Sequence, residues 1–483
     1  MPSKNVKSKK SPAKRKTPAK KTPVKSTAII EAHHRSATQR RAEGKALRDA
    51  APRESQSGWK EPEDRRDPVE IVLASNAGRR QELVPIRHAR MMQSPFAFYR
   101  GTAAIMAADL ARTPVSSLRV QACGDAHLSN FGGFATPERD VIFDVNDLDE
   151  TLPAPWEWDL KRLCASVVLA GRHNRFKKGD PERAARAAAA SYRQHMAEYA
   201  FMRALDIWYD KIDLKRYLER AANEKTRARI SQRVEQARGR SVVEHDFPKL
   251  VEHTGETARI KDNPPLIFHP EDLEKDVESG DVRPALAAYR ESLPEHVRVL
   301  YDRFELCDFA VKVVGVGSVG TLCLVALYMA GNGDPLFLQV KQANASVLEP
   351  YAGKSLHQNH GQRVVVGQRL MQAASDIFLG WTQGRRGRHF YIRQLRDMKL
   401  SAVIEGMDFD ALRGYVEACG WALARAHARS GDAAMISGYM GSSRAFDDAI
   451  TSFSVDYADQ AERDYKAFVQ AHLDGRVEAA SEY

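Results

Sequence analysis

The loop Cys123-Gly-Asp-Ala-His-Leu-Ser-Asn130 carries residue types that could transfer a phosphoryl group. Such chemistry needs a carboxylate that orients the attacking hydroxyl, an amide that holds one metal ion, and a second carboxylate that holds metal ions against the nucleotide phosphates. Asp125 and Asn130 supply the first two groups on one tight loop, and His127 lies between them. We therefore take Asp125, His127 and Asn130 as candidate catalytic residues.

Acidic residues follow this loop where the second carboxylate is needed. A glycine pair and the turn TPERD separate two strand-like segments, and the second segment, VIFDV, leads into Asp144, Asp147 and Asp149. Because Mg²⁺ prefers oxygen ligands, Asn130 together with Asp147 or Asp144 is the candidate metal site. The alternative is that this acidic cluster is only a solvated turn.

A glycine-rich segment occurs far downstream, at Gly315-Val-Gly-Ser-Val-Gly320. The residues after it are β-branched and apolar rather than helical, and the next strand ends in Lys341, so a dinucleotide-binding fold is not indicated. A strand, a glycine turn, a strand and then LQVK is a layout in which backbone amides and a lysine contact nucleotide phosphates. The candidate nucleotide-binding residues are Gly315, Gly317, Ser318, Gly320 and Lys341. The alternative is a hairpin whose glycines serve only the turn, with an ordinary lysine at a strand edge.

The partner of Lys341 is open from the sequence. The helix expected after its strand, GQRVVVGQRLMQAASDIF, contains no glutamate that could pair with the lysine, and Glu349 is the nearest acid. Arg100, in the segment FYRG before the first loop, could contact substrate or phosphate, or form a structural ion pair.

The first loop resembles the HGDLHPGN loop of the aminoglycoside and choline kinases, with its Asp, His and Asn in matching places and Cys123 where those enzymes usually have histidine. The following DLDETLPAPWEWDL has the length of the pattern that continues this motif in the same family. The resemblance implies ATP and Mg²⁺ as cofactors, Asp147 as the metal carboxylate, and Asp159 as a buried acid that hydrogen-bonds the backbone of the catalytic loop. It also implies a protein-kinase-like, two-lobed α+β fold that is mostly helical.

The two motifs come in the reverse of the kinase order, because here the catalytic loop precedes the glycine-rich segment. The helix-like segment 412–430 resembles the helix that leads into the kinase catalytic loop, and joining residue 430 to residue 119 would restore the usual order. We therefore predict a circular permutation, which proteins tolerate when the old termini lie close together.

From about residue 59 to the C-terminus the chain also resembles the bacterial domain-of-unknown-function 2252 family. The segments that carry this resemblance are RMMQSPFAFYRG (90–101), CGDAHLSNFGGF (123–134), FDVNDLDE (143–150), PWEWDLKRL (155–163), VVGVGSVGT (313–321), LQVKQA (338–343), GQRLMQAASDIFLGW (367–381) and LARAHARSGD (423–432). It implies no particular reaction or substrate.

Composition and periodicity divide the chain into four parts. We expect a disordered basic tail at residues 1–56 and a helical lobe at 57–305 that contains the catalytic-loop hairpin (119–163). A β-rich nucleotide lobe with the glycine turn follows at 306–405, and helices that return to the helical lobe follow at 406–483. Between Trp158 and Glu305 the pattern predicts only helices.

The formal charge of +10 comes from the start of the chain, because residues 1–30 contain ten Lys or Arg and no acid. Clustered lysines attract phosphate backbones through the release of counterions, so residues 4–25 could bind a polyanion or nucleic acid. A solubilising extension is the alternative.

The five cysteines have no paired spacing, which suits neither a zinc site nor a disulfide framework and favours a reducing, cytoplasmic location. The longest apolar run, 311–329, is broken by a lysine and three glycines, so no membrane span is expected. The first hypothesis is an ATP- and Mg²⁺-dependent phosphotransferase that acts on an unidentified hydroxyl of a small molecule or protein. The alternatives are a catalytically inactive nucleotide-binding regulator and a nucleic-acid-associated protein that works through its lysine-rich tail.

Overall fold

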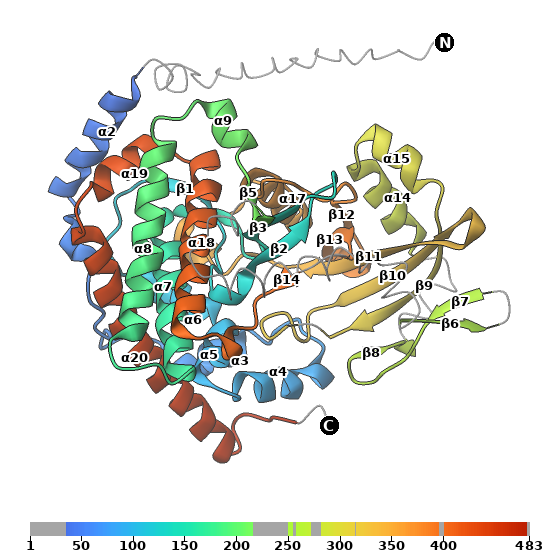
Figure 1. Ribbon diagram of the computed structural model, residues 1–483. Helices are drawn as coiled ribbons and strands as arrows, with labels where there is room; N and C mark the ends of the chain where they lie inside the picture. Colours follow the sequence, from blue (N-terminus) through green and yellow to red (C-terminus); the bar gives the residue numbers. More distant parts are fainter. Residues whose placement is uncertain are drawn as a thin grey trace, which may run out of the picture.

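Helices and sheets are both prominent in the computed structural model, as expected for an α+β protein (Figure 1). The structure describes residues 35–215, 250–254, 257–271, 282–313, 315–395 and 400–480. The basic segment 4–25 lies outside these residues, so its binding to polyanions stays a prediction.

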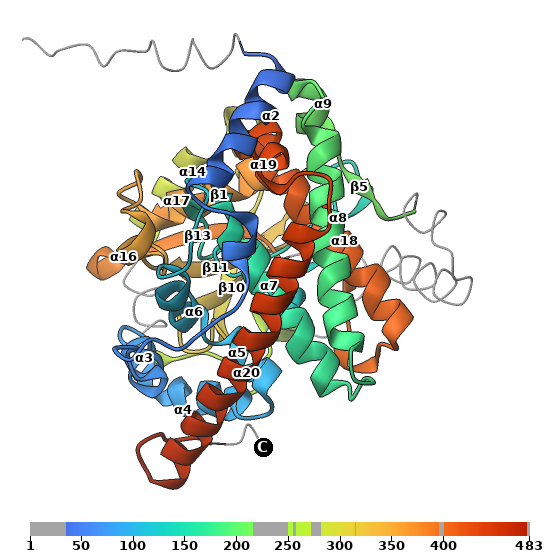
Figure 2. The ribbon, with the colours of Figure 1, turned by 90° about the vertical axis from the view of Figure 1, so that its left-hand side faces the viewer.

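Long helices from the middle and the end of the chain build the larger body, where α7, α8, α18 and α20 lie side by side (Figure 2). Helix α7 is buried along almost its whole length, and alanines on α8 let α18 approach closely. A Cβ added at Gly420 of α18 would lie 2.4 Å from the carbonyl oxygen of Ala188, so this crossing requires glycine. The bounds of these helices are Trp156–His173, Asp180–Tyr199, Phe409–Ser430 and Ala445–Leu473.

The expectation that residues 1–56 form a disordered tail is wrong for residues 37–56. Helix α2 (Ala37–Ala46) begins at a capping box formed by Ser36 and Gln39, and it packs on α19 (Ala433–Met440). The contact is between backbones, since a Cβ added at Gly44 or at Gly438 would lie 2.0 Å from a carbonyl oxygen of the facing helix. A helix that packs through glycine shows no apolar periodicity, which is why the sequence pattern missed it. The short 3₁₀ helices η1 (Leu47–Asp49) and η2 (Arg53–Gln56) follow it.

The candidate catalytic loop joins two small antiparallel sheets on the inner side of this body. Strand β1 precedes the loop and pairs with β4, while β2 follows the loop and pairs with β3, which is buried throughout. Strands β14 and β5 extend the second sheet at its two edges. The bounds are Arg119–Ala122 (β1), Phe131–Ala135 (β2), Val141–Val145 (β3), Leu152–Pro155 (β4), Ile212–Asp213 (β5) and Leu400–Ser401 (β14).

The second body is an antiparallel sheet of six strands in the order β12-β13-β11-β10-β9-β8. The glycine-rich segment connects β9 to β10, Lys341 lies on the central strand β11, and helix α17 connects this strand to β12 and β13. Apart from the short strand β8, the strands of this sheet lie between residues 305 and 394. The bounds are Ile267–Phe268 (β8), Glu305–Lys312 (β9), Cys323–Ala330 (β10), Asp334–Ala343 (β11), His360–Met371 (α17), Gly380–Gln383 (β12) and His389–Gln394 (β13).

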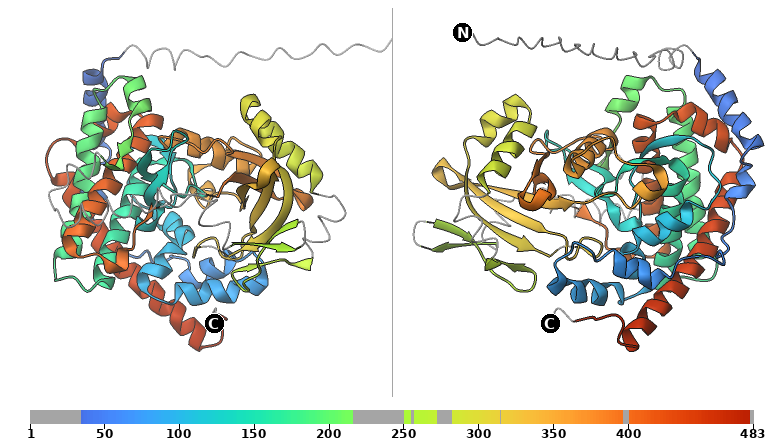
Figure 3. Two further views of the ribbon diagram at one scale, coloured as in Figure 1. Left: turned by 45° about the vertical axis from the view of Figure 1, so that its right-hand side comes forward. Right: turned by 180° about the vertical axis from the view of Figure 1, so that it is seen from behind.

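The described residues between 250 and 304 belong to the sheet body rather than to the helical one, which corrects the expected boundary at residue 305 and the prediction of helices alone. Helices α14 and α15 cover one face of the sheet, and the hairpin β6–β7 lies on the other (Figure 3). Because alternate residues of a strand face opposite sides, Ala326 and Tyr328 of β10 pack under α14 and α15, whereas Val325 and Leu327 pack against the hairpin. Short half-buried strands give too weak a pattern to be told from helix. The bounds are Val251–Thr254 (β6), Thr257–Ile260 (β7), Arg283–Ser292 (α14) and Glu295–Tyr301 (α15).

Four short helices before the catalytic loop connect the bodies, as the expected helical lead-in required. The N–H of Arg80 donates to the carbonyl oxygen of Gly320 at 2.7 Å. The end of the chain holds them from the other side, since His88 contacts the carbonyl oxygen of Glu478 at 2.6 Å and the N–H of Ala480 donates to Pro85. The bounds are Pro68–Ala74 (α3), Val84–Met91 (α4), Pro95–Arg100 (α5) and Ala103–Leu110 (α6), and elsewhere Ala204–Tyr209 (α9) and Glu349–Ala352 (α16). Within the described ranges, no helix is both long and apolar enough for a membrane crossing.

Candidate functional site

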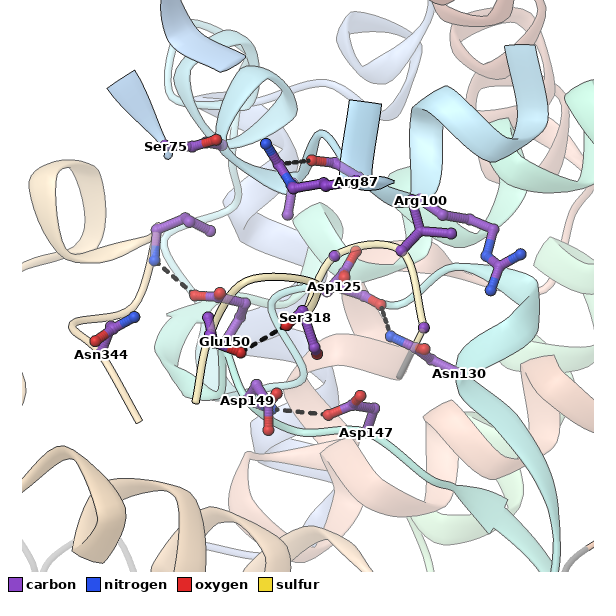
Figure 4. Close-up of a pocket in the computed structure, with 18 of the residues that line it drawn as sticks. Ser75, Arg87, Arg100, Asp125, Asn130, Asp147, Asp149, Glu150, Ser318 and Asn344 are labelled. Atoms are coloured by element: carbon purple, nitrogen blue, oxygen red, sulfur yellow. Dashed lines mark hydrogen bonds between the residues drawn. The ribbon is translucent and has the colours of Figure 1, made fainter. Parts of the chain in front are cut away.

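The candidate catalytic loop and the glycine turn line one pocket between the two bodies (Figure 4). Five parts of the chain meet there: the loop, the acidic segment after β3, the turn between β9 and β10, the end of β11 with the residues after it, and the short lead-in helices with the loop between α3 and α4. The polar and glycine lining includes Ser75, Arg79, Arg87, Arg100, Asp125, His127, Asn130, Asp147, Asp149, Glu150, Gly315, Gly317, Ser318, Thr321, Gln342 and Asn344. Most of the predicted site residues are therefore brought together, while Gly320, Lys341 and Asp144 do not line the pocket.

The catalytic loop is held by Asp159 at the start of α7. One carboxylate oxygen of Asp159 accepts the N–H of Cys123 at 2.6 Å, and the other accepts the N–H of Gly124 at 2.9 Å. His427 of α18 contacts the same carboxylate at 3.0 Å. These contacts confirm the predicted buried acid and explain Cys123, which is fully buried and serves as packing for the loop.

Asp125 faces the pocket with one oxygen engaged from behind by Arg162. The distance from Arg162 Nε to Asp125 Oδ1 is 2.6 Å, and His127 Nε2 lies 3.7 Å from Oδ2. Burial raises the pKa of Asp125, and Arg162 opposes that rise. Burial, with the charges of Arg162 and Arg100, holds the pKa of His127 well below its usual value, so this imidazole is neutral at pH 7. Asp125 is therefore the group of the loop that can accept a proton from a ligand.

Asn130 and Asp147 bring oxygen atoms to the same side of the pocket. The amide nitrogen of Asn130 donates to the carbonyl oxygen of Asp125 at 2.7 Å, which fixes the side chain and leaves its amide oxygen as an acceptor. The side chain of Asp147 is 35% exposed, although it lies near a buried lysine. This pair has the donor types of a Mg²⁺ site that is completed by ligand oxygens and water.

Asp144, the rival metal ligand, is fully buried behind the pocket. Both of its carboxylate oxygens lie 2.7 Å from Arg425 Nη2, and one also accepts the N–H of Ala373 at 2.8 Å. These contacts tie β3 to α18 and to the end of α17. Of the two candidates, only Asp147 reaches the pocket.

Lys341 has its partners on the acidic segment rather than on the following helix. Its Nζ lies 2.7 Å from Asp149 and 3.6 Å from Asp147, and Tyr391 donates its hydroxyl to Asp149 at 2.6 Å. Burial lowers the pKa of Lys341, but the two carboxylates together raise it well above the usual value. The lysine is therefore a charged clamp on the acidic segment.

Helix α17 contributes an arginine where a glutamate was sought. Arg363 donates to the carbonyl oxygens of Asp149, Thr151 and Asn344 at 2.6 to 2.9 Å, which joins the acidic segment to the sheet body. Glu150 lines the pocket beside it, and burial raises the pKa of its carboxyl to about 7.

The glycine turn is anchored by the lead-in helices. Its backbone is left-handed at Gly315 and Gly320, with φ of 67° and 84°, which favours glycine at both positions. Arg79 Nη1 donates to the carbonyl oxygen of Val319 at 2.5 Å, and Arg90 donates to that of Gly315. Gly320 thus shapes the turn, whereas Gly315, Gly317 and Ser318 reach the pocket.

Sequence reasoning missed several residues that shape the site. One had a signal, because Arg162 follows Asp159 by three positions and so lies on the same face of a helix. The others act across the fold and had none. They are Arg79, Arg87, Glu150, Arg363 and Tyr391.

Residues 79–471 match the family described as "Uncharacterized protein conserved in bacteria (DUF2252)". The chain belongs to the DUF2252 family. The matched range contains the sheet body, most of the helical body and every lining residue of the pocket except Ser75. No curated protein and no solved structure matches the chain. The function of this DUF2252 protein must therefore be inferred from its own pocket.

Proposed function

We propose that the protein is an ATP- and Mg²⁺-dependent phosphotransferase that acts on a hydroxyl acceptor. The observation that carries this proposal is the convergence of the catalytic loop, the acidic segment and the glycine turn on one pocket. The loop and the turn are far apart in the sequence, and phosphoryl transfer needs both in one place.

Asp125 is positioned to orient the acceptor hydroxyl and to take its proton. One oxygen is held by Arg162, so the other is directed at the pocket, where an acceptor can reach it. Asn130 Oδ1 and Asp147 would hold Mg²⁺, which when bound neutralises charge on the phosphates being transferred. Among the described residues no group of three or more His, Cys, Asp and Glu side chains could hold a metal ion alone, and this agrees with a site that the nucleotide completes.

The glycine turn would contact the nucleotide phosphates through backbone N–H groups. Gly317 contributes by its size, because a Cβ there would lie 3.4 Å from the carbonyl oxygen of Arg100 and would narrow the pocket. Lys341 acts on the phosphates indirectly in this arrangement, since it fixes Asp147 and Asp149.

The order of elements supports a kinase-like fold with a permuted chain. Strand β9, the glycine turn, β10, β11 with its lysine, α17, β12, β13 and α18 come in the kinase order, and the catalytic loop follows if residue 430 is joined to residue 119. These two points are adjacent in space, because Ser430 accepts the N–H of Gln121 at 2.9 Å. A short connection between residues 430 and 119 would therefore place the elements in the kinase order.

The test is ATP binding and turnover by the purified full-length protein with a panel of hydroxyl acceptors. D125N should bind Mg²⁺-ATP normally and lose transfer, whereas D147N should lose the Mg²⁺ dependence of binding. D140N is the matched control, because Asp140 lies on the same hairpin and pairs with Lys211 outside the pocket. Full turnover in D125N, or unchanged Mg²⁺ dependence in D147N, would overturn the proposal.

A nucleotide-binding regulator without transfer is the second candidate. The observation that favours it is that Lys341 is 4% exposed and already paired with carboxylates, while α17 offers no acid to replace them. It predicts that Mg²⁺-ATP raises the melting temperature and that no acceptor in the panel is phosphorylated.

A further inference from the structure

The pocket has a basic wall opposite its acidic segment. We define this basic wall by Arg79, Arg87 and Arg100, which come from the loop after α3, from α4 and from the end of α5. Figure 4 shows Arg87 and Arg100 on one side of the pocket and Asp147 and Asp149 on the other. The catalytic loop lies between the two sides.

None of the three guanidinium groups forms an ion pair within 4 Å of a carboxylate in the part of the chain that the structure describes, although Glu405 and Asp125 act on Arg100, and Glu150 on Arg79, at longer range. Arg87 donates to Asn76 Oδ1 at 2.7 Å and to the carbonyl oxygen of Gly101 at 2.9 Å, while its Nε is buried without a partner. Arg79 donates only to carbonyl oxygens. The side chain of Arg100 makes no hydrogen bond to the described residues, and its Nε is also buried. These arginines therefore keep donors available.

Burial of cations without counter-charges is unfavourable, because lost hydration is not replaced by an ion pair. Burial lowers the pKa of Arg79 to about 10, and burial with the charge of Arg79 lowers that of Arg87 well below its usual value. By contrast, Arg65 in the same helical body is shared between two carboxylates, Asp109 and Asp464, at 2.8 and 2.6 Å. The missing negative charge at the basic wall would be supplied by an anion in the pocket.

We propose that the basic wall binds a phosphate group of a substrate, beside Asp125. Arginine suits this ligand because its planar fork donates two parallel hydrogen bonds to an oxyanion. Two sources share this chemistry, a phosphorylated acceptor and the terminal phosphate of the nucleotide. The anion site itself needs no catalysis, and only the choice between the sources depends on the proposed transfer reaction.

The experiment measures how phosphate ligands bind to the full-length protein and to R100Q. This variant should fold, since the side chain of Arg100 makes no hydrogen bond within the described structure, and equal melting temperatures without ligand would confirm it. R79Q is the second variant. R80Q is the matched control, because Arg80 directly follows Arg79 but pairs with Glu82 and does not line the pocket. Calorimetry would measure the affinities for Mg²⁺-ATP and Mg²⁺-ADP. The affinity for orthophosphate would be measured from the rise in melting temperature with orthophosphate concentration, at constant ionic strength.

The expected result is an affinity loss of about tenfold or more in R100Q and R79Q, as for removal of a charged hydrogen bond, with R80Q unchanged. Weaker orthophosphate binding with unchanged nucleotide binding supports a phosphorylated acceptor. If R100Q and R79Q lose more affinity for Mg²⁺-ATP than for Mg²⁺-ADP, relative to the wild type, the anion bound by the basic wall is the terminal phosphate of the nucleotide. The proposal is overturned if R100Q and R79Q bind each of the three ligands as tightly as R80Q does. Orthophosphate binding that depends on Arg100 in a protein that binds no ATP would support it while rejecting the proposed transfer.

Discussion

Replacement of Lys341 by methionine tests whether the acidic segment is held by this buried charge. The substitution removes an ammonium group 2.7 Å from Asp149 and 3.6 Å from Asp147 and leaves two carboxylates facing each other. Loss of one partner from a fully buried ion pair costs about 3–5 kcal/mol. Because these carboxylates are 28% and 35% exposed, water screens part of the loss, and we expect the free energy of unfolding to fall by about 2–3 kcal/mol at pH 8.

The loss should depend on pH in a defined direction. Burial and the charge of Asp147 already raise the pKa of Asp149, and Lys341 opposes them, so K341M should raise that pKa further. A carboxyl whose folded pKa exceeds its unfolded value, about 3.9, binds more protons in the folded state between the two values. Stability of K341M should therefore decrease as pH rises through this window. Lys341 itself is protonated at pH 5 and at pH 8, so the wild type does not gain a matching dependence from it.

The assay is urea unfolding followed by circular dichroism at pH 5 and pH 8. K312M, on strand β9 of the same sheet, is the control and should change stability by less than about 0.5 kcal/mol. The double variant K341M/D149N removes the charge that was left unpaired and should recover most of the loss at pH 8. If K341M lowers the free energy of unfolding no more than K312M does, or by the same amount at both pH values, Lys341 does not hold the acidic segment through its charge.

Two further predictions concern other contacts of the fold. D159N should reduce the free energy of unfolding by about 1–3 kcal/mol, because its amide nitrogen cannot accept one of the two backbone N–H groups of the catalytic loop; a loss below about 0.5 kcal/mol in urea unfolding would contradict this. G438A should cost a similar amount, about 1–3 kcal/mol, since its Cβ overlaps α2, and hydrogen exchange of residues 37–46 should accelerate. G414A on α18, where a Cβ meets nothing within 4 Å, should leave that exchange unchanged.

The local order of the site was readable in the sequence, whereas its long-range charge pairing was not. The catalytic loop, its brace by Asp159 and the strands around the glycine turn each depend on residues close together in the chain. The partner of Lys341 depends on how the sheet body docks onto the helical one, and no local pattern records that docking. The search for a glutamate on the next helix therefore looked in the wrong element.

The basic wall was hidden for a related reason. Arg79 lies in the loop after α3 and Arg87 in the short helix α4. The turn between β9 and β10 and the end of α20 surround these segments, and arginines in such segments usually face solvent. Helix α2 was missed because its contact surface is glycine backbone. Both cases show interactions set by shape and tertiary context rather than by the alternation of apolar and polar residues.

The contacts of Glu478 and Ala480 with α4 impose an order on biosynthesis. The lead-in helices leave the ribosome early, yet His88 and Pro85 find these partners only after residue 480 has emerged. The packing of α4 is therefore complete only after residues 478–480 have been synthesised. A chain cut before Glu478 would carry every candidate catalytic residue and still lack the support of the helix that presents Arg87.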